Sequence, residues 1–113
     1  MMKKKVNILG TEYEVMLDAP DELLPEDADG VMDHSIKRIV VAKFESDRNS
    51  VKDLKAYRKK VLRHEVIHAF LYESGLWNNS GNVTAWGTSE EITDWFAIQS
   101  PKIMKVFEEL EVL

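Results

Sequence analysis

The amino-acid sequence predicts a small α+β domain, with its strands in the first 45 residues and its helices in the rest of the chain. Residues 4–17 alternate apolar and polar side chains, which is the period of a half-buried strand. Residues 31–44 contain the β-branched run Ile39-Val40-Val41, and apolar positions recur at helical spacing from residue 51 onward. The chain has 113 residues, 44% of them hydrophobic, so we expect one domain over residues 1–113.

Two strand pairs are expected in the first part of the chain. Apolar residues alternate with polar ones on both sides of Gly10-Thr11, so residues 4–17 are predicted to form a hairpin. Residues 18–30 are acidic and contain two prolines, which predicts a loop with no more than one helical turn. Residues 31–44 then supply the second strand pair.

A long helix is expected over residues 51–74. Ser50 can cap it, with Asp53 as the partner in a capping box. Gly75 suits the position just after the end of a helix, because glycine tolerates the left-handed conformation found there. Residues 76–87 are rich in Asn and Gly, so we expect a loop to follow.

Two further helices are expected near the end of the chain. The first begins near Thr88 or Ser89 and runs to about Gln99. Ser100-Pro101 is predicted to end it and to start the next, because serine caps helices well and proline is favoured at the first helical position. The last helix then carries an apolar stripe that consists of Ile103, Phe107 and Leu110.

Composition argues against several classes of function. The net charge of -5 speaks against non-specific binding to nucleic acid, which depends on neutralising phosphates. The chain has no cysteine, so it uses neither disulfides nor thiolate zinc ligands. The start of the sequence lacks the apolar segment of a signal peptide, and no stretch approaches the length of a membrane span. We therefore expect a cytoplasmic protein that binds neither membrane nor nucleic acid, with a monomer as the default.

His64 and His68 lie four residues apart within the predicted long helix. Residues at this spacing share one helix face, so both imidazoles can reach one point. Two imidazole nitrogens are half of a tetrahedral zinc site, with zinc–nitrogen distances of about 2.0–2.1 Å. Glu65 lies about 100° around the helix, where it can reach a water on the metal rather than the metal itself. The pattern predicts one zinc ion per chain, with Glu65 as the general base.

The residues around this motif are suited to a buried helix that forms the floor of a cleft. An ordinary pair of surface histidines with an incidental glutamate is the alternative, and charged neighbours would favour it. Instead, six of the neighbouring positions are uncharged: Val61, Leu62, Val66, Ile67, Ala69 and Phe70.

A third zinc ligand must come from elsewhere in the chain, because catalytic zinc normally has three protein ligands and one open position. Glu90 and Asp94 lie four residues apart at the start of a predicted helix and share one face. Glu90 is our preferred ligand, with Asp94 orienting His64 through its second ring nitrogen. Glu91 is the alternative ligand, although it falls at a capping-box position if Thr88 caps the helix. The alternative is that Glu90, Glu91 and Asp94 bind no metal and only interact favourably with the positive end of the helix dipole.

Other parts of the site are left open by the sequence. Trp77 and Trp86 either line the cleft or anchor a long loop to the core. His34 and Tyr72 are the candidates for an oxyanion-stabilising group, although an ordinary turn or surface position explains His34 better and a core position explains Tyr72 better. An extended substrate is expected along an exposed strand edge near residues 38–44.

The motif His64-Glu65-Val66-Ile67-His68, followed by Glu90 and Asp94, resembles the gluzincins, the zinc peptidases of the HExxH…ExxxD type. The short spacing and the small chain are most similar to the ImmA/IrrE-like metallopeptidases and to small phage- and prophage-associated zincins. The stretches "HAFLYESGL" and "DWFAIQSPKI" add to the resemblance, which covers most of residues 30–105. It implies a zincin-like fold, in which a small twisted sheet packs on the helix that carries HExxH and a second helix delivers the glutamate.

The resemblance and the motif together predict a zinc metallopeptidase that hydrolyses peptide bonds through a zinc-bound water. A protein or peptide is the expected substrate, and a regulatory protein is one option. The alternative function is a non-catalytic, zinc-stabilised binding or regulatory module of phage or prophage origin. Glu65 favours the enzyme, because a purely structural site has no use for a base.

Overall fold

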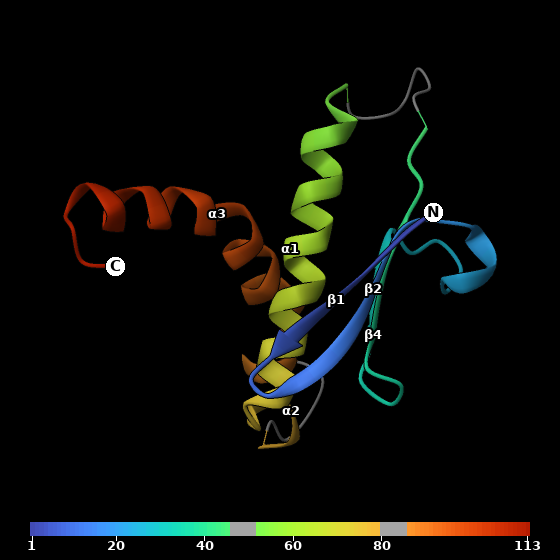
Figure 1. The fold of residues 1–113 in the computed structure, drawn as a ribbon, viewed down its shortest axis with the longest axis horizontal. Helices are drawn as coiled ribbons and strands as arrows, with labels where there is room; N and C mark the ends of the chain where they lie inside the picture. Colours follow the sequence, from blue (N-terminus) through green and yellow to red (C-terminus); the bar gives the residue numbers. More distant parts are fainter. Residues whose placement is uncertain (46–51, 80–85) are drawn as a thin grey trace.

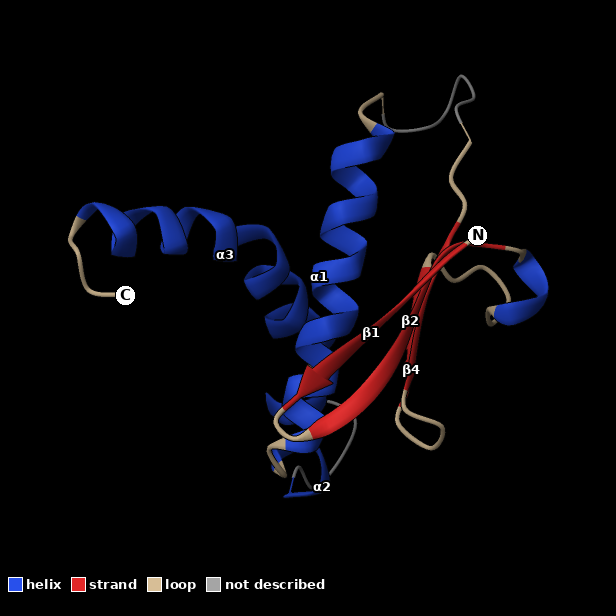
Figure 2. Cartoon of the chain, in the orientation of Figure 1, coloured by secondary structure: helices blue, strands red, loops and turns tan. Residues whose placement is uncertain are grey.

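A computed structural model of the chain describes residues 1–45, 52–79 and 86–113. The fold is α+β: a four-stranded mixed sheet in the order β1-β2-β4-β3, followed by helices. Helix α1 (Leu54–Glu73) lies between the sheet and the first half of helix α3 (Glu90–Glu109), as Figures 1 and 2 show. Among the described residues, no helix combines the length and the apolar character that crossing a bilayer requires.

The N-terminal hairpin is confirmed. Strands β1 (Met2–Ile8) and β2 (Thr11–Ala19) pair antiparallel, and the turn between them places Leu9 and Gly10 at positive φ. The side chain of Asn7 accepts a hydrogen bond from the Gly10 backbone N–H at 2.8 Å, which closes the turn. The loop that follows contains one 3-10 turn, η1 (Asp21–Leu23), within the single helical turn that the sequence allowed.

The second strand pair is also confirmed, but its place in the sheet was not predicted. Strand β3 (Gly30–Asp33) pairs antiparallel with β4 (Arg38–Ala42), which in turn pairs parallel with β2. Strand β4 is therefore an interior strand with both edges occupied. The expectation of a free strand edge near residues 38–44 is wrong, and the edge strand on this side of the sheet is β3.

The strands bury alternate residues on two different faces, as their period of two requires. One face packs under α1 and contains the fully buried Tyr13, Ile39 and Val41. The opposite face forms a smaller apolar cluster with Met16 and Val40, against which Leu24 packs. The main core therefore lies between the sheet and α1.

Helix α1 begins three residues later than the sequence predicted. Asp53 is its N-cap, and its carboxylate accepts a hydrogen bond from the Ala56 backbone N–H at 3.0 Å. The predicted cap Ser50 lies outside the described residues. No residue from Val61 to Ala69 is exposed, which agrees with a helix enclosed on most sides, whereas Phe70 is 42% exposed.

The segment after α1 is not a simple loop. A short helix, α2 (Leu76–Asn79), follows Gly75, which adopts a positive φ as expected, and a 3-10 turn, η2 (Trp86–Thr88), precedes α3. The remainder of the predicted loop, residues 80–85, is outside the described residues.

The two predicted C-terminal helices are one continuous helix, so the expected break at Ser100-Pro101 is wrong. Pro101 lies inside α3, where its lack of an N–H leaves the carbonyl of Ala97, four residues earlier, without its helical partner. The Arg63 side chain on α1 donates a hydrogen bond to that carbonyl at 2.5 Å. A neighbouring helix thus supplies the missing donor, and this supports helix continuation through the proline.

Candidate metal centre

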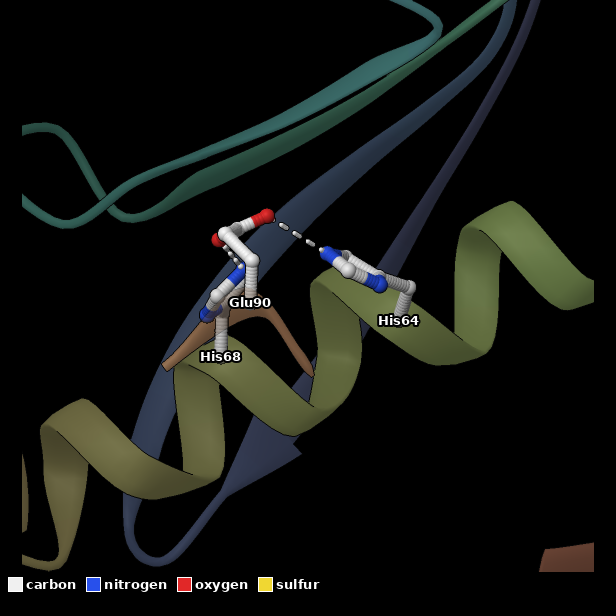
Figure 3. A group of neighbouring side chains, drawn as sticks. All are labelled: His64, His68 and Glu90. Atoms are coloured by element: carbon white, nitrogen blue, oxygen red, sulfur yellow. Dashed lines mark hydrogen bonds and ion pairs between the residues drawn. The ribbon is translucent and has the colours of Figure 1, made fainter. Parts of the chain in front are cut away.

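Three predicted ligands meet between α1 and the first turn of α3. The Nε2 atom of His68 is 2.6 Å from one oxygen of Glu90, and the Nε2 atom of His64 is 3.1 Å from the other. One donor atom from each of the three residues lies within 4.8 Å of the other two. Figure 3 shows the three side chains turned toward one another. The group combines two imidazoles with a carboxylate, which is a donor set that catalytic zinc uses.

Asp94 lies where the sequence placed it, beside the second ring nitrogen of His64. The distance from His64 Nδ1 to Asp94 Oδ1 is 3.3 Å, and Lys60 Nζ is 3.3 Å from the same oxygen. An ionised carboxylate can only accept, so Asp94 favours a proton on His64 Nδ1, and Glu90, 3.1 Å from Nε2, favours one on Nε2. A cation in place of the Nε2 proton would leave His64 in the tautomer that Asp94 holds.

His68 is held differently from His64. Its side chain is only 6% exposed, and burial lowers the pKa of its imidazole. Its Nδ1 atom is buried and has no hydrogen-bond partner among the described residues. The ring of Trp77 packs edge-on against the His68 ring, with their centroids 5.7 Å apart. Apolar packing thus orients this imidazole.

Glu65 is buried beside the ligands but does not belong to the group of three. Burial raises the pKa of its carboxyl to about 7, and the negative charge of Glu90 acts in the same direction. The backbone N–H of Met32 on β3 donates a hydrogen bond to this carboxylate. A methyl group added at Gly30 would lie 3.1 Å from Glu65 Cγ, so the glycine allows β3 to approach α1 closely.

Glu91 is not part of the group of three, and the condition for its capping role, Thr88 as the N-cap, is not met. The N-cap of α3 is Ser89 rather than Thr88, and its hydroxyl accepts a hydrogen bond from the Ile92 backbone N–H at 3.3 Å. Glu91 therefore falls outside the capping-box position. Glu90 is nevertheless the acid that faces the two histidines, because Glu90 and Asp94 share a helix face.

The candidate aromatic residues separate into two environments. Trp77 packs against the main core, and it also contacts His34 and Tyr72, whose rings stack with centroids 4.3 Å apart. His34 and Tyr72 thus contact each other, which is a packing role. Trp86 is 57% exposed, so it does not anchor its segment to the core.

A cavity of about 180 Å³ opens next to the ligands and is lined in part by Gly30, Tyr57, Lys60, His64 and Glu65. A larger cavity of about 720 Å³ lies between the acidic loop and the end of β4, and none of the three ligands lines it. The sequence analysis overlooked Lys60, although its position four residues before His64 places it on the same helix face. No sequence pattern indicated the approach of Gly30.

The charges around the group suit a cation. Glu65, Glu90 and Asp94 bring three carboxyl groups to two imidazoles, and Lys60 is the cationic side chain paired with them. A divalent ion bound between the two Nε2 atoms and Glu90 would offset this excess of negative charge. The residues present therefore fit the predicted zinc ion.

Comparison with models of protein families, with curated proteins and with solved structures finds no match for this chain.

Proposed function

We propose that this chain is a small zinc metallopeptidase of the gluzincin type, similar to the ImmA/IrrE-like and phage-associated zincins. The observation that carries the proposal is the convergence of His64 Nε2, His68 Nε2 and the Glu90 carboxylate within 4.8 Å, with buried Glu65 beside them. His64, His68 and Glu90 would hold one zinc ion per chain, and Asp94 would orient His64.

Zinc bound at this position would act as a Lewis acid that makes a water more acidic and polarises a peptide carbonyl. Glu65 accepts the proton of the attacking water and later passes it to the leaving amine. Its buried position suits this role, because burial raises the pKa of the carboxyl and so makes it a stronger base than an exposed glutamate.

The edge strand β3 is the part of the sheet on which an extended peptide could add. The Asp29 carbonyl accepts a hydrogen bond from the Ala42 backbone N–H, so the alternation of an antiparallel pair points the backbone groups of Gly30 and Met32 away from β4. Glu65 contacts this same edge. A peptide laid along β3 would therefore pass beside the general base, in the manner of strand addition.

Substitution of Glu65 by glutamine tests the proposal, because it removes the base and keeps the shape. Zinc content per chain and cleavage of a mixed peptide library are measured for wild type and for Glu65→Gln. Glu91→Gln is the matched control, since Glu91 is an exposed acid outside the group. We expect one zinc per chain in all three proteins, and about 10²–10⁴-fold less cleavage in Glu65→Gln alone.

Absence of zinc from the wild-type protein, both as purified and after zinc addition, would overturn the proposal. Equal cleavage by wild type and Glu65→Gln would remove Glu65 from the mechanism. If all three proteins bind zinc and none cleaves a peptide, the non-catalytic zinc-stabilised binding or regulatory module becomes the better account.

A further inference from the structure

Two cavities border each other at the start of the edge strand β3, because Ala28 and Asp29 line both of them. The smaller cavity, of about 180 Å³, is also lined by the metal ligand His64 and the base Glu65. The larger cavity, of about 720 Å³, lies between the acidic loop and the end of β4. A peptide that adds to β3 beside Glu65 and extends beyond the start of this strand would therefore pass Asp29.

Asp29 is held in place from two sides. Its backbone carbonyl accepts a hydrogen bond from the Ala42 N–H at 2.9 Å, which ties it to the end of β4. One oxygen of its carboxylate accepts a hydrogen bond from the hydroxyl of Tyr57 on α1. The other oxygen has no hydrogen bond or ion pair with any other described residue, and the side chain is exposed. Asp29 therefore presents an oriented negative charge that a ligand can reach.

The charges along this path favour a basic side chain over an acidic one. In the smaller cavity Asp94 is paired with Lys60, whereas Asp29 has no cationic partner among the described residues. In the larger cavity, Lys43 is the one cationic side chain of the described part of the chain, and it faces three further acids. These acids are Asp21, Glu26 and Asp27. Such an arrangement selects a partner by charge, because like charges placed opposite each other are unfavourable.

We propose that Asp29 is a specificity-determining residue, which binds the side chain of a lysine or arginine in the substrate. Asp29 would thus define the substrates of the proposed peptidase, on which this role rests, as basic peptides. Glu65 contacts the edge between Gly30 and Met32, and a strand advances about 3.3 Å per residue. The basic residue therefore lies within about three positions of the cleaved bond. Arginine suits the site best, because its guanidinium pairs with a carboxylate and can stack on the Tyr57 ring, which lines the same cavity.

Peptide retention tests the role of Asp29 without requiring turnover. A mixed peptide library is passed over the immobilised full chain in its Glu65→Gln form, loaded with zinc, and the retained peptides are sequenced by mass spectrometry. We expect lysine and arginine to be enriched at least about threefold over the input. Asp29→Asn in this background keeps an acceptor for Tyr57 but removes the charge, so most of the enrichment should disappear. Asp29→Lys should favour aspartate and glutamate instead.

Glu22 provides the matched controls, because it is an exposed acid of the same loop that lines neither cavity. Glu22→Gln and Glu22→Lys change the net charge as the two Asp29 variants do, and they should leave the enrichment unchanged. Circular dichroism should show that every variant is folded. The proposal is overturned if the retained peptides show no enrichment of basic residues, or if the Glu22 and Asp29 variants lose it equally.

Cleavage of the same library by the wild-type chain separates the role of Asp29 from the proposed function. Cleavage with no preference for basic residues near the cut overturns the role of Asp29 and leaves the peptidase standing. Retention of basic peptides that depends on Asp29, without any cleavage by wild type, has the opposite meaning: it overturns the peptidase and leaves Asp29 as a residue that binds basic peptides.

Discussion

Helix α1 carries two polar clusters, one near its middle and one at its C-terminal end, and they are built in opposite ways. At Glu73 the carboxylate accepts hydrogen bonds from Thr11 Oγ1 at 2.8 Å, Tyr13 Oη at 2.6 Å and Lys37 Nζ at 3.0 Å. At His64 and His68 the imidazoles face carboxylates, and a buried Glu65 lies next to them. The first cluster is balanced in charge, whereas the second has an excess of acid.

The pKa values show the same contrast. Hydrogen bonds from Tyr13 and Lys37 lower the pKa of Glu73 to about 2, so its charge is fully stabilised by the chain itself. Burial raises the pKa of Glu65 to about 7, so the negative charge of this carboxylate is not fully stabilised by the chain. The Glu73 cluster, whose hydrogen bonds are completed within the chain, joins the hairpin to α1. The cluster at His64 and His68 leaves negative charge uncompensated, and this is the arrangement that suits a bound cation.

The largest expected effect is the loss of zinc affinity in Glu90→Ala. A structural zinc site is worth roughly 10–16 kcal/mol over four ligands, so removing one ligand should weaken binding by about 10²–10³-fold. Glu91→Ala is the control and should leave zinc affinity unchanged, with at most about 1 kcal/mol lost from its helix-dipole interaction. Competition with a chromogenic chelator measures both affinities. The reverse result would make Glu91 the ligand.

Asp94→Asn should produce the next largest effect. The amide can accept from His64 Nδ1 but carries no charge, so zinc affinity should fall by about 10–100-fold while the fold is retained. Glu73→Gln serves as the comparison, since it changes the other cluster on the same helix and should leave zinc affinity as in wild type. If Asp94→Asn binds zinc as tightly as wild type, Asp94 does not orient the ligand.

Glu73→Gln should change stability instead of metal binding. Its hydrogen bonds include one from a lysine, so we expect a loss of about 1–3 kcal/mol in the free energy of unfolding at pH 7. Chemical denaturation of the zinc-free protein measures this loss. Unchanged stability would mean that the cluster contributes no more than exposed ion pairs do.

The pH dependence of stability should follow the same carboxylate. The pKa of Glu73 is about 2 in the folded chain, against an ordinary value of 4.5, so the unfolded chain takes up a proton first as the pH falls. Its stabilisation is complete above about pH 5 and disappears as the pH approaches 2. Glu73→Gln should flatten that part of the stability profile, and a profile as steep as that of wild type would assign the slope to other acids.

The smallest expected effect concerns Arg63, which lies one residue before His64 and joins α1 to α3 by a hydrogen bond. Arg63→Ala removes the donor to the Ala97 carbonyl and should cost about 1 kcal/mol of stability. In a Pro101→Ala background the restored backbone N–H can serve the same carbonyl, so the cost of Arg63→Ala should become smaller there. Equal costs in both backgrounds would show that the arginine does not compensate for the proline.

Sequence reasoning succeeded where spacing along one helix decides the geometry. His64 and His68 share a face of α1, and Glu90 and Asp94 share a face of α3, because 3.6 residues make a turn whatever surrounds the helix. The alternation of β2 likewise assigned its residues to two faces of a sheet.

Reasoning from spacing failed at Ser100-Pro101, where local preference predicted a break. The helix continues through the proline, and Arg63, more than thirty residues earlier, supplies a donor to the carbonyl that the proline frees. The cap of α3 was left open between Thr88 and Ser89, since both are good caps and the sequence does not choose between them, and it is Ser89.

The sequence by itself determined which side chains of this protein share a helix face and could bind one metal ion, because helical periodicity depends only on residues within one or two turns. Only the tertiary structure decided that β4 lies inside the sheet, that β3 is the edge beside Glu65, and that Gly30 lets the two approach. The order of strands depends on which long-range pairings bury the most apolar surface. Many orders are compatible with one pattern of alternation, so that choice is made only when the whole chain packs together.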